Sequence, residues 1–363
     1  MKRLVIAGVG MADGKTLTKR AEEAISSADF LIGGRRLLAG YPDKPQMALD
    51  KNLREAVAYI EENCEKQRIC VLVSGDTGFY SYTKYLLSKL PADIEAEVIC
   101  GVGSMQYFCA KLHLSYEDMA AVSMHGRSGN LLSTISGRRY TFVLTGGEYR
   151  AQDVCRLLWE RGGGSLPVSA GENLGGTGER ILRGTAEELM KLTFGNLTVL
   201  LVENPQAAKK RFFEEDKLAA LNCLKLVPED CCIDLSGGEI AAAIAGKVGG
   251  DVLCRTKDAE GLRRICRKYS RYNIKPVPEG GGDAGITAAY AEGSGMEALF
   301  ALLKRNPELR FALAVRDKGQ ARRAAMRLQQ LSILFDISCH SRLNAAFSPV
   351  ESTYIFHKKG QQA

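Results

Sequence analysis

A Ser-Gly-Asp-Thr-Gly segment at residues 74–78 is the strongest indication of ligand binding in this sequence. It follows an apolar run at 70–73, typical of a strand buried on both faces, and precedes helical spacing at 79–90. Turns at the carboxyl ends of parallel strands are where α/β folds bind ligands, and glycine lets the backbone approach a ligand closely. Asp76 could accept a ligand hydrogen bond or cap the turn. An ordinary strand-to-helix turn is the alternative interpretation.

Four other short segments place glycine, serine or basic residues directly after an apolar run. They are Gly8-Val9-Gly10, Gly33-Gly34-Arg35-Arg36, Gly101-Val102-Gly103-Ser104 and His125-Gly126-Arg127. A nicotinamide-binding interpretation of the first segment is weak. The position of its third glycine holds Asp13, and no acidic residue ends the second expected strand.

Metal binding and serine-nucleophile chemistry are poorly supported. The four histidines (His113, His125, His340 and His357) form no spaced ligand pair, and the eleven cysteines include no Cys-x-x-Cys. The sequence also contains no Gly-x-Ser-x-Gly elbow. We therefore expect no metal site, and reduced thiols that pack as small apolar residues in the cytoplasm.

Composition favours a soluble protein of two domains. The chain has 363 residues, 45% of them hydrophobic and 25% charged, and no apolar run reaches membrane-spanning length. The start of the chain is too short an apolar run for a secretory signal. Residues 1–205 carry 24 basic and 24 acidic side chains, whereas residues 206–363 carry 25 and 18, so the net charge of +7 lies in the second half. Its basic stretches at 263–275 and 316–327 favour solvated helix faces, with a polyanionic ligand or nucleic acid as alternatives.

Strands and helices alternate over about residues 4–112, which predicts a parallel sheet with helices on its faces. The expected strands are 4–7, 30–32, 70–73, 97–99, 120–124, 140–144, 167–170, 197–202, 231–235, 251–255, 311–315 and 353–357. The expected helices are 16–27, 53–66, 79–90, 105–112, 151–161, 218–224, 239–247 and 260–269. A linker at 204–210 separates a first domain, 1–205, from a second, 206–363. Within the first, subdomains of about 1–112 and 113–205 are expected.

The order of these motifs resembles the tetrapyrrole (corrin/porphyrin) methylase family, within it the branch that methylates C5 of precorrin-6Y or a cobalt-precorrin. The resemblance covers about the first 205 residues and is more specific than a lone glycine motif. The matching segments are Ala7–Gly10 with Leu17, Thr18 and Ala21, then Gly33–Leu37, Ser74–Tyr80, Gly101–Gln106, Val122–Arg127, Gly171–Gly176, Glu179–Ile181 and Gly184–Leu189. His-Gly-Arg and Gly-Gly-x-Arg point to the C5 branch.

The resemblance implies two α/β subdomains, S-adenosylmethionine (SAM) in the cleft between them, and a homodimer formed through the N-terminal domain. Carried over by position, the cofactor-binding residues are Gly8, Gly10, Met11, Ser74, Gly75, Asp76, Phe79, Gly103, Ser104, Thr145, Gly146 and Gly184. One departure is Met11-Ala12, where the family has Pro-Gly, and the loss of a rigid turn residue could loosen this loop.

The activity implied is methyl transfer to the C5 meso carbon of a corrin precursor in cobalamin biosynthesis. Because the macrocycle carries many carboxylates, Arg35, Arg36 and Arg127 are expected to bind it. His125 is expected to orient the substrate or move a proton, with a loop histidine bonded to local backbone as the alternative. Asp76 is expected to shape the cofactor loop, and Glu172 and Glu179 to form structural pairs with Arg180.

The second half resembles, more faintly, the C15-methylating and decarboxylating partner domain, a Rossmann-like SAM-methyltransferase-type fold. Residues 234–245 align with the glycine-rich loop that opens a helix, but Ser236 and Ile240 replace two glycines and only Gly238 remains. Arg255 stands near the place of the ribose-binding acid. We therefore expect a degenerate or repurposed domain, with C15 methylation and decarboxylation doubtful.

Two other functions remain open. Relatives of the same fold methylate diphthine on a translation factor or ribose in ribosomal RNA, and on that hypothesis the basic second half holds RNA. A non-catalytic scaffold for corrin assembly is the other, although the intact glycine motifs disfavour it. The sequence leaves open whether the ring already carries cobalt.

Overall fold

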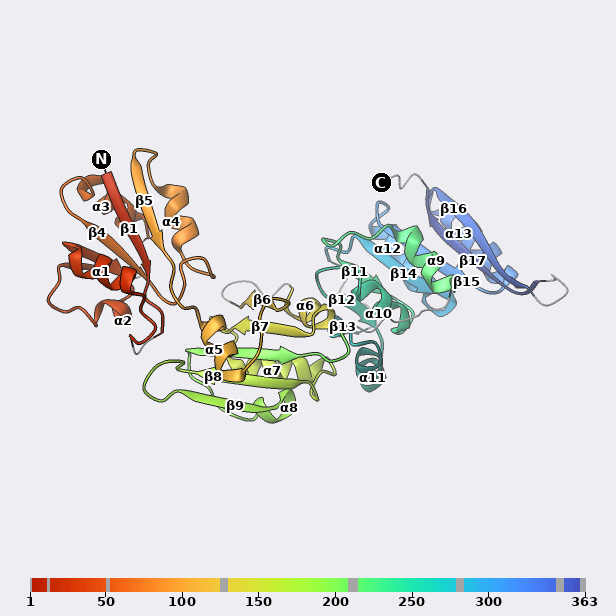
Figure 1. Ribbon diagram of the computed structural model, residues 1–363. Coiled ribbons are helices and arrows are strands. Elements are labelled where there is room, and N and C mark those ends of the chain that lie inside the picture. Colours follow the sequence, from red (N-terminus) through yellow and green to blue (C-terminus); the bar gives the residue numbers. More distant parts are fainter. Residues whose placement is uncertain are drawn as a thin grey trace.

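The computed structural model describes residues 2–11, 14–49, 53–124, 130–207, 215–278, 284–343 and 349–359. Helices and strands alternate and form three sheets that follow one another along the molecule (Figure 1). The α/β fold class predicted from the sequence is therefore confirmed. Among the described residues, no helix is long and apolar enough to cross a membrane.

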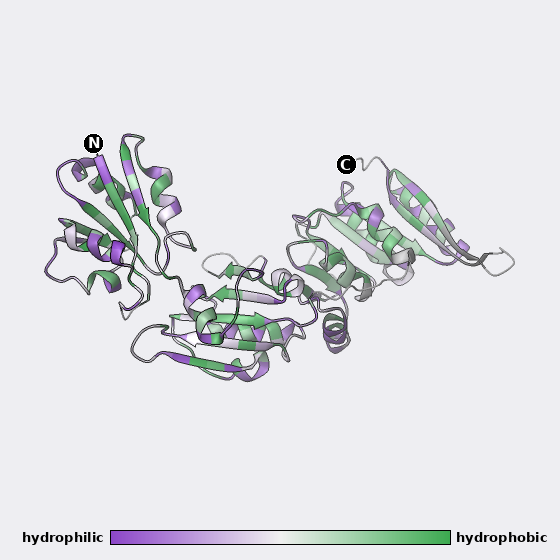
Figure 2. Cartoon of the chain, viewed as in Figure 1, coloured by the Kyte–Doolittle hydropathy of each residue, from purple (hydrophilic) through white to green (hydrophobic). Residues whose placement is uncertain are grey.

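The first sheet is entirely parallel, with the order β3-β2-β4-β1-β5. Its strands are β1 (Lys2–Gly8), β2 (Phe30–Gly33), β3 (Gln46–Ala48), β4 (Ile69–Val73) and β5 (Ile94–Ile99). Its helices are α1 (Lys19–Ser27), α2 (Arg35–Leu38), α3 (Leu53–Asn63) and α4 (Thr83–Lys89). Helices α1 and α2 pack on one face, and α3 and α4 on the other. The central strand β4 is consequently buried along its whole length, and the strands are coloured as mainly apolar in Figure 2.

The second sheet is mixed, with the order β6-β7-β10-β8-β9. Its strands are β6 (Ala120–Ser123), β7 (Tyr140–Leu144), β8 (Pro167–Glu172), β9 (Arg180–Thr185) and β10 (Thr198–Glu203). The helices of this part are α5 (Ser104–Leu112), α6 (Leu131–Gly137), α7 (Ala151–Glu160) and α8 (Ala186–Leu189). Only β6 and β7 pair in parallel, so this sheet, unlike the first, is mostly antiparallel. The reason is the β8–β9 hairpin, whose outer strand is too polar to be recognised from its sequence.

The third sheet has the order β13-β12-β11-β14-β15-β17-β16, and β17 runs antiparallel to both neighbours. Its strands are β11 (Cys232–Asp234), β12 (Val252–Arg255), β13 (Ile274–Val277), β14 (Ala288–Glu292), β15 (Arg310–Val315), β16 (Phe335–Leu343) and β17 (Pro349–Lys358). Its helices are α9 (Glu215–Leu224), α10 (Glu239–Ala245), α11 (Ala259–Tyr269), α12 (Met296–Arg305) and α13 (Lys318–Gln330), with a 3-10 turn η1 (Gly293–Gly295). The order of β13 to β15 is the doubly wound one, with its reversal between β11 and β14.

The second and third sheets share one hydrophobic core, which combines side chains of α6 and α7 with those of α9, α10 and α11. Buried polar groups reinforce this junction. The Tyr272 N–H donates to Ser136 Oγ at 2.8 Å, and the largely buried Arg161 pairs with Asp251 at 3.1 Å. Ser133 Oγ donates to the Gly249 carbonyl at 2.6 Å. Asn204, at the start of the expected linker, is fully buried and donates to the Ile135 carbonyl.

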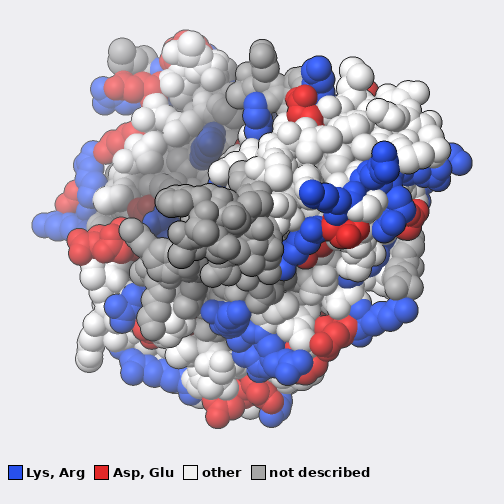
Figure 3. All heavy atoms as spheres, turned by 90° about the vertical axis from the view of Figure 1, so that its right-hand side faces the viewer, with Lys and Arg blue, Asp and Glu red and all other residues white. Residues whose placement is uncertain are grey.

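Several basic residues of the second half lie on the helices α11, α12 and α13. Figure 3 shows Lys and Arg interspersed with Asp and Glu over one side of the molecule. On α11, Arg263 and Arg267 both pair with Glu260, at 3.1 and 3.0 Å, and Arg264 pairs with Asp258. This pairing within one helix favours the solvated-face interpretation over a surface built for a polyanion.

Candidate active site

Three glycine turns meet at the carboxyl ends of β1, β4 and β5. Gly10 and Gly75 form an isolated antiparallel bridge between the first two turns, and both have positive φ angles, of +67° and +68°. A Cβ atom on Gly8 would lie 2.7 Å from Gly101 N and 2.8 Å from Gly75 O, and one on Gly101 would overlap the Gly75 carbonyl. The three turns can approach this closely only without side chains. We name Gly8, Gly10, Gly75, Gly101 and Gly103 the glycine cradle.

Asp76 holds two of these turns together. Its Oδ1 accepts from the Gly78 N–H at 2.8 Å, and its Oδ2 accepts from the Gly101 N–H at 3.0 Å. Both carboxylate oxygens therefore bond backbone N–H groups of the β4 and β5 turns. This favours the shaping role expected from the sequence over a role as a base.

Met11 occupies the position where the family has proline, and its loop is held by a hydrogen bond. The Met11 N–H donates to Thr16 Oγ1 at 2.6 Å, a bond that proline could not make. The Met11 side chain is 9% exposed and packs in a cluster with Phe108 and Phe142 of the second part. Its Cε would lie 3.7 Å from a Cβ on Gly75. The described part of this loop is therefore anchored.

Phe79 and Tyr80 connect the β4 turn to the second sheet. The Phe79 ring packs against Phe142 with centroids 5.9 Å apart, and the Tyr80 hydroxyl donates to the Ala121 carbonyl at 2.8 Å. Tyr80 has a φ of +46°, so the chain turns here before α4 begins. The helix expected at 79–90 consequently starts only at Thr83.

The expected cofactor residues of the second sheet are less closely grouped. Thr145 follows β7, and its buried hydroxyl donates to the Thr198 carbonyl at 2.6 Å. Gly146 forms a bridge with Tyr149. Gly184 lies on the edge strand β9 and pairs with Val168, near the start of β8, whereas Thr145 lies near the end of β8. A Cβ atom on Gly184 would meet the Glu188 side chain. The structure thus does not bring Gly184 to Thr145.

The expected substrate-binding arginines divide into two groups. Arg35 and Arg36 begin α2, and the Arg36 guanidinium donates to Ser74 Oγ at 3.0 Å, which places it at the edge of the glycine cradle. His125 and Arg127 lie in the segment 125–129, outside the described residues.

Of the two expected pairs with Arg180, the structure contains one. Arg180 pairs with Glu172 at 2.7 Å. Glu179 instead pairs with Lys111 of α5 at 2.8 Å and accepts from the Gly175 N–H and the Tyr107 hydroxyl, both at 2.7 Å. These bonds, led by Lys111, lower the pKa of Glu179 to about 2. The group fastens α5 to the β8–β9 loop.

Two residues of the site were not singled out from the sequence, although both lie in the Gly101–Gln106 motif. Gly101 is required by close packing. Gln106 lies in the first turn of α5 with its Oε1 buried against Gly103 and without a hydrogen-bond partner among the described residues. The sequence motif contains both residues, but their roles follow only from the contacts in the structure.

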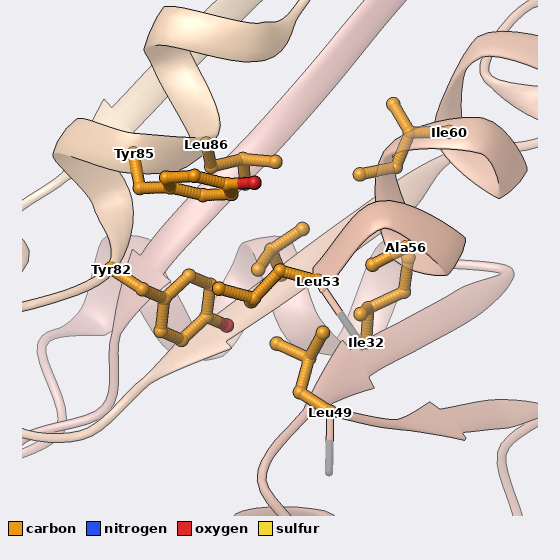
Figure 4. A pocket seen from close by; sticks show the side chains of 9 residues that line it. Ile32, Leu49, Leu53, Ala56, Ile60, Tyr82, Tyr85 and Leu86 are labelled. Carbon is orange, nitrogen blue, oxygen red and sulfur yellow. The ribbon is translucent and has the colours of Figure 1, made fainter. Parts of the chain in front are cut away.

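Two hollows in the described structure lie away from the glycine cradle. One is an apolar cavity between α3, α4 and the first sheet, lined by aliphatic side chains and the Tyr82 and Tyr85 rings (Figure 4). The other is a cleft of about 150 Å³ between Trp159 and the α11 residues Glu260, Arg263 and Arg267. Among the described residues, no three His, Cys, Asp or Glu side chains gather as a metal site needs.

The third sheet has its own candidate crevice, at the reversal between β11 and β14. Asp234 is fully buried there, where burial raises its pKa to about 6, and its Oδ1 accepts from the Ser236 N–H. Ser236 Oγ accepts from the Glu292 N–H at 2.6 Å and so joins the ends of β11 and β14. A Cβ on Gly238 would meet Leu262 and Ile265 of α11 at 3.0 and 3.1 Å. The chain's own side chains therefore occupy the surroundings of this loop.

Comparison with known proteins shows the family of this chain. A model of the tetrapyrrole (corrin/porphyrin) methylases matches residues 3–190, and the chain belongs to this family of methyltransferases. A cobalt-precorrin-7 C(5)-methyltransferase of Salmonella typhimurium is 31% identical over 180 residues, which cover 49% of this chain and 88% of that protein. The decarboxylating precorrin-6Y C(5,15)-methyltransferase of a Sinorhizobium species is 26% identical over 208 residues, covering 55% of this chain and 49% of that protein. A solved precorrin-6Y methylase of Archaeoglobus fulgidus superposes with a TM-score of 0.45 and 24% identity, covering 56% of this chain and 98% of that chain.

Proposed function

We propose that the first domain, residues 1–205, transfers a methyl group from SAM to C5 of a corrin precursor in cobalamin biosynthesis. The observation that carries this proposal is the glycine cradle, formed by three family motifs at one edge of the first sheet. The relatives reported above that are named as C5-methyltransferases match this same half of the chain. That match favours a tetrapyrrole substrate over RNA or a translation factor.

The residues of the cradle fit a SAM-type ligand. Gly10 and Gly75 adopt positive φ angles at the tips of adjacent strands, and Gly103 with Ser104 opens the nine-residue helix α5. The Gly10 and Gly75 N–H groups donate to each other's carbonyls and so shape the turns, whereas the start of α5 favours the negative charge of a carboxylate. We propose that these residues, with Met11, Ser74 and Phe79, hold the cofactor.

Methyl transfer places modest chemical demands on the protein. Bound SAM supplies an electrophilic methyl group, so no metal or activated serine is needed. The cradle fixes the position of one reactant, and the apolar cluster around Met11, Phe79 and Phe142 keeps water from the adjoining surface. Orientation and exclusion of water can together lower the barrier by several kcal/mol.

We propose that the arginines bind the carboxylates of the substrate at the edge of the glycine cradle. Arg36 lies at the cradle edge, where its guanidinium can bind a carboxylate of the macrocycle. We retain Arg35, Arg127 and His125 as substrate or proton-transfer residues on the strength of their motifs. Arg127→Ala is expected to weaken binding of the corrin precursor about tenfold or more and to leave SAM affinity unchanged.

The proposal is tested by incubating the full chain with SAM and the corrin precursor, with and without cobalt, and measuring product mass. Gain of one methyl group is expected. No gain with either ring, together with tight and salt-sensitive binding to generic RNA, would instead support the RNA-modifying alternative.

We further propose that the third sheet does not bind SAM in the ordinary manner. Ile240, at a glycine position of the loop, is buried in the core shared with the second sheet, and Ser236 joins two strand ends where a ligand would lie. A product that gains two methyl groups, or one with loss of carbon dioxide, would contradict this. A homodimer in the cytoplasm is also expected, and light scattering of the purified chain checks the dimer.

A further inference from the structure

A buried amide oxygen, Gln106 Oε1, lies at the glycine cradle without a hydrogen-bond partner among the described residues. Gln106 is the third residue of α5, and its Oε1 is 2.6 Å from the position that a Cβ on Gly103 would take. This oxygen is buried and makes no hydrogen bond to any described residue. Buried carbonyl oxygens in proteins are nearly always bonded, and leaving one unpaired costs about 1–3 kcal/mol. A partner at this position is therefore expected.

The neighbouring polar groups are already bonded. Both Asp76 oxygens accept from backbone N–H groups of the cradle, and the Ser74 hydroxyl accepts from Arg36. A third-position glutamine often closes a helix start by accepting the N-cap backbone N–H, which here belongs to Gly103, but the structure contains no such bond. The oxygen is thus an unpaired acceptor buried beside Gly103 and Asp76.

We propose that Gln106 is a positioning residue for the methyl donor, and that its Oε1 accepts a hydrogen bond from an ammonium or hydroxyl group of bound SAM. This inference rests on the proposed function. The Asp76 carboxylate already accepts two backbone hydrogen bonds from the turns. The neutral carboxamide of Gln106 provides a further acceptor without adding a negative charge beside it. The bond selects a ligand that carries a donor at this point, and it fixes the ligand's register along the cradle.

The test compares Gln106→Met with a matched control, Gln152→Met. Gln152, on α7, also has a buried Oε1 that bonds no residue in the described part of the chain, but it lies outside the cradle. Calorimetry with SAM is expected to show about tenfold weaker binding for Gln106→Met and unchanged binding for Gln152→Met. Thermal unfolding without SAM should show no loss of stability in either variant, because methionine removes the unpaired oxygen.

A third variant, Gln106→Glu, retains an acceptor oxygen and is expected to bind SAM at least as well as Gln106→Met, with recovery towards the wild-type affinity. Wild-type SAM affinity in Gln106→Met would overturn the inference. A lowered melting temperature of Gln106→Met in the absence of SAM would also overturn the inference if the loss of stability accounts for the weaker binding. That result would identify Gln106 as a helix-capping residue. If the wild-type chain and Gln152→Met also fail to bind SAM, the proposed function itself is wrong, and the inference with it.

Discussion

Gly10 and Gly75 exchange backbone hydrogen bonds across the tips of β1 and β4. The Gly10 N–H donates to the Gly75 carbonyl at 3.2 Å, and the Gly75 N–H donates to the Gly10 carbonyl at 3.1 Å. Both residues have positive φ angles, which residues other than glycine adopt only with backbone strain. The pair therefore fixes the distance between two turns that come from residues 65 positions apart in the sequence.

Gly75→Ala is expected to weaken SAM binding at least tenfold. A methyl group at this position lies against Gly103 and Met11, at 3.4 and 3.7 Å, and blocks approach to the backbone. Gly285→Ala is the matched control, since Gly285 has a φ of +73° and nothing within 4 Å of its Cβ position. Each substitution should cost about 1–2 kcal/mol of stability from backbone strain. Equal SAM affinity of the two variants, measured by calorimetry, would remove Gly75 from the site.

Thiol alkylation offers an independent test of where the donor binds. Cys100 is exposed and directly precedes Gly101, whereas burial raises the pKa of Cys70, Cys155 and Cys266 to about 12 and makes them unreactive. Cys339, also exposed, lies on β16 of the third sheet. Saturating SAM should slow alkylation of Cys100 severalfold and leave Cys339 unchanged, as measured by peptide mass spectrometry. Protection of Cys339 alone would locate the donor in the third sheet.

The sequence was sufficient to predict the α/β class and most elements with strong apolar patterns. The predicted strand at 140–144 agrees with β7, and the apolar run at 70–73 lies in β4. It was insufficient for the edge strand β9, whose residues lack the alternation that marks a half-buried strand. The edge strand β16 was missed although its apolar residues Phe335, Ile337 and Cys339 alternate with polar ones.

The candidate site shows the same division. The resemblance to the family indicated which glycine turns belong to one site, and the strand ends of a parallel sheet, which share one edge, bring them together. The partners of Glu179 could not be predicted, since Lys111 and Tyr107 come from a helix distant in sequence. The packing role of Ile240 could likewise not be predicted. The sequence shows only that isoleucine replaces a glycine of the family's loop, whereas in the structure its side chain packs in the core shared by two sheets.

Asp234 is expected to make stability depend on pH. Because its folded-state pKa is about 6, above the ordinary value of 3.8, the protonated form is favoured on folding, and stability is lost as pH rises through 6. The loss amounts to at most about 3 kcal/mol. Urea unfolding of Asp234→Asn, compared with wild type between about pH 4 and 7, should show the variant gaining in relative stability as pH rises to about 6 and little further gain above it. A constant difference across this range would mean that Asp234 is ionised throughout.

The shared core predicts that the second and third sheets unfold as one unit. Trp159, the single tryptophan of the chain, lies on α7 with the Arg263 guanidinium 5.2 Å from its ring centroid, so its fluorescence reports on this junction. Phe311→Ala removes a fully buried ring from the far face of the third sheet, at a cost of about 3–5 kcal/mol. The Trp159 unfolding midpoint in urea should fall with that loss. Ile60→Ala, in the separate core of the first sheet, should move it much less. A Trp159 midpoint unaffected by Phe311→Ala would show that the two sheets unfold independently.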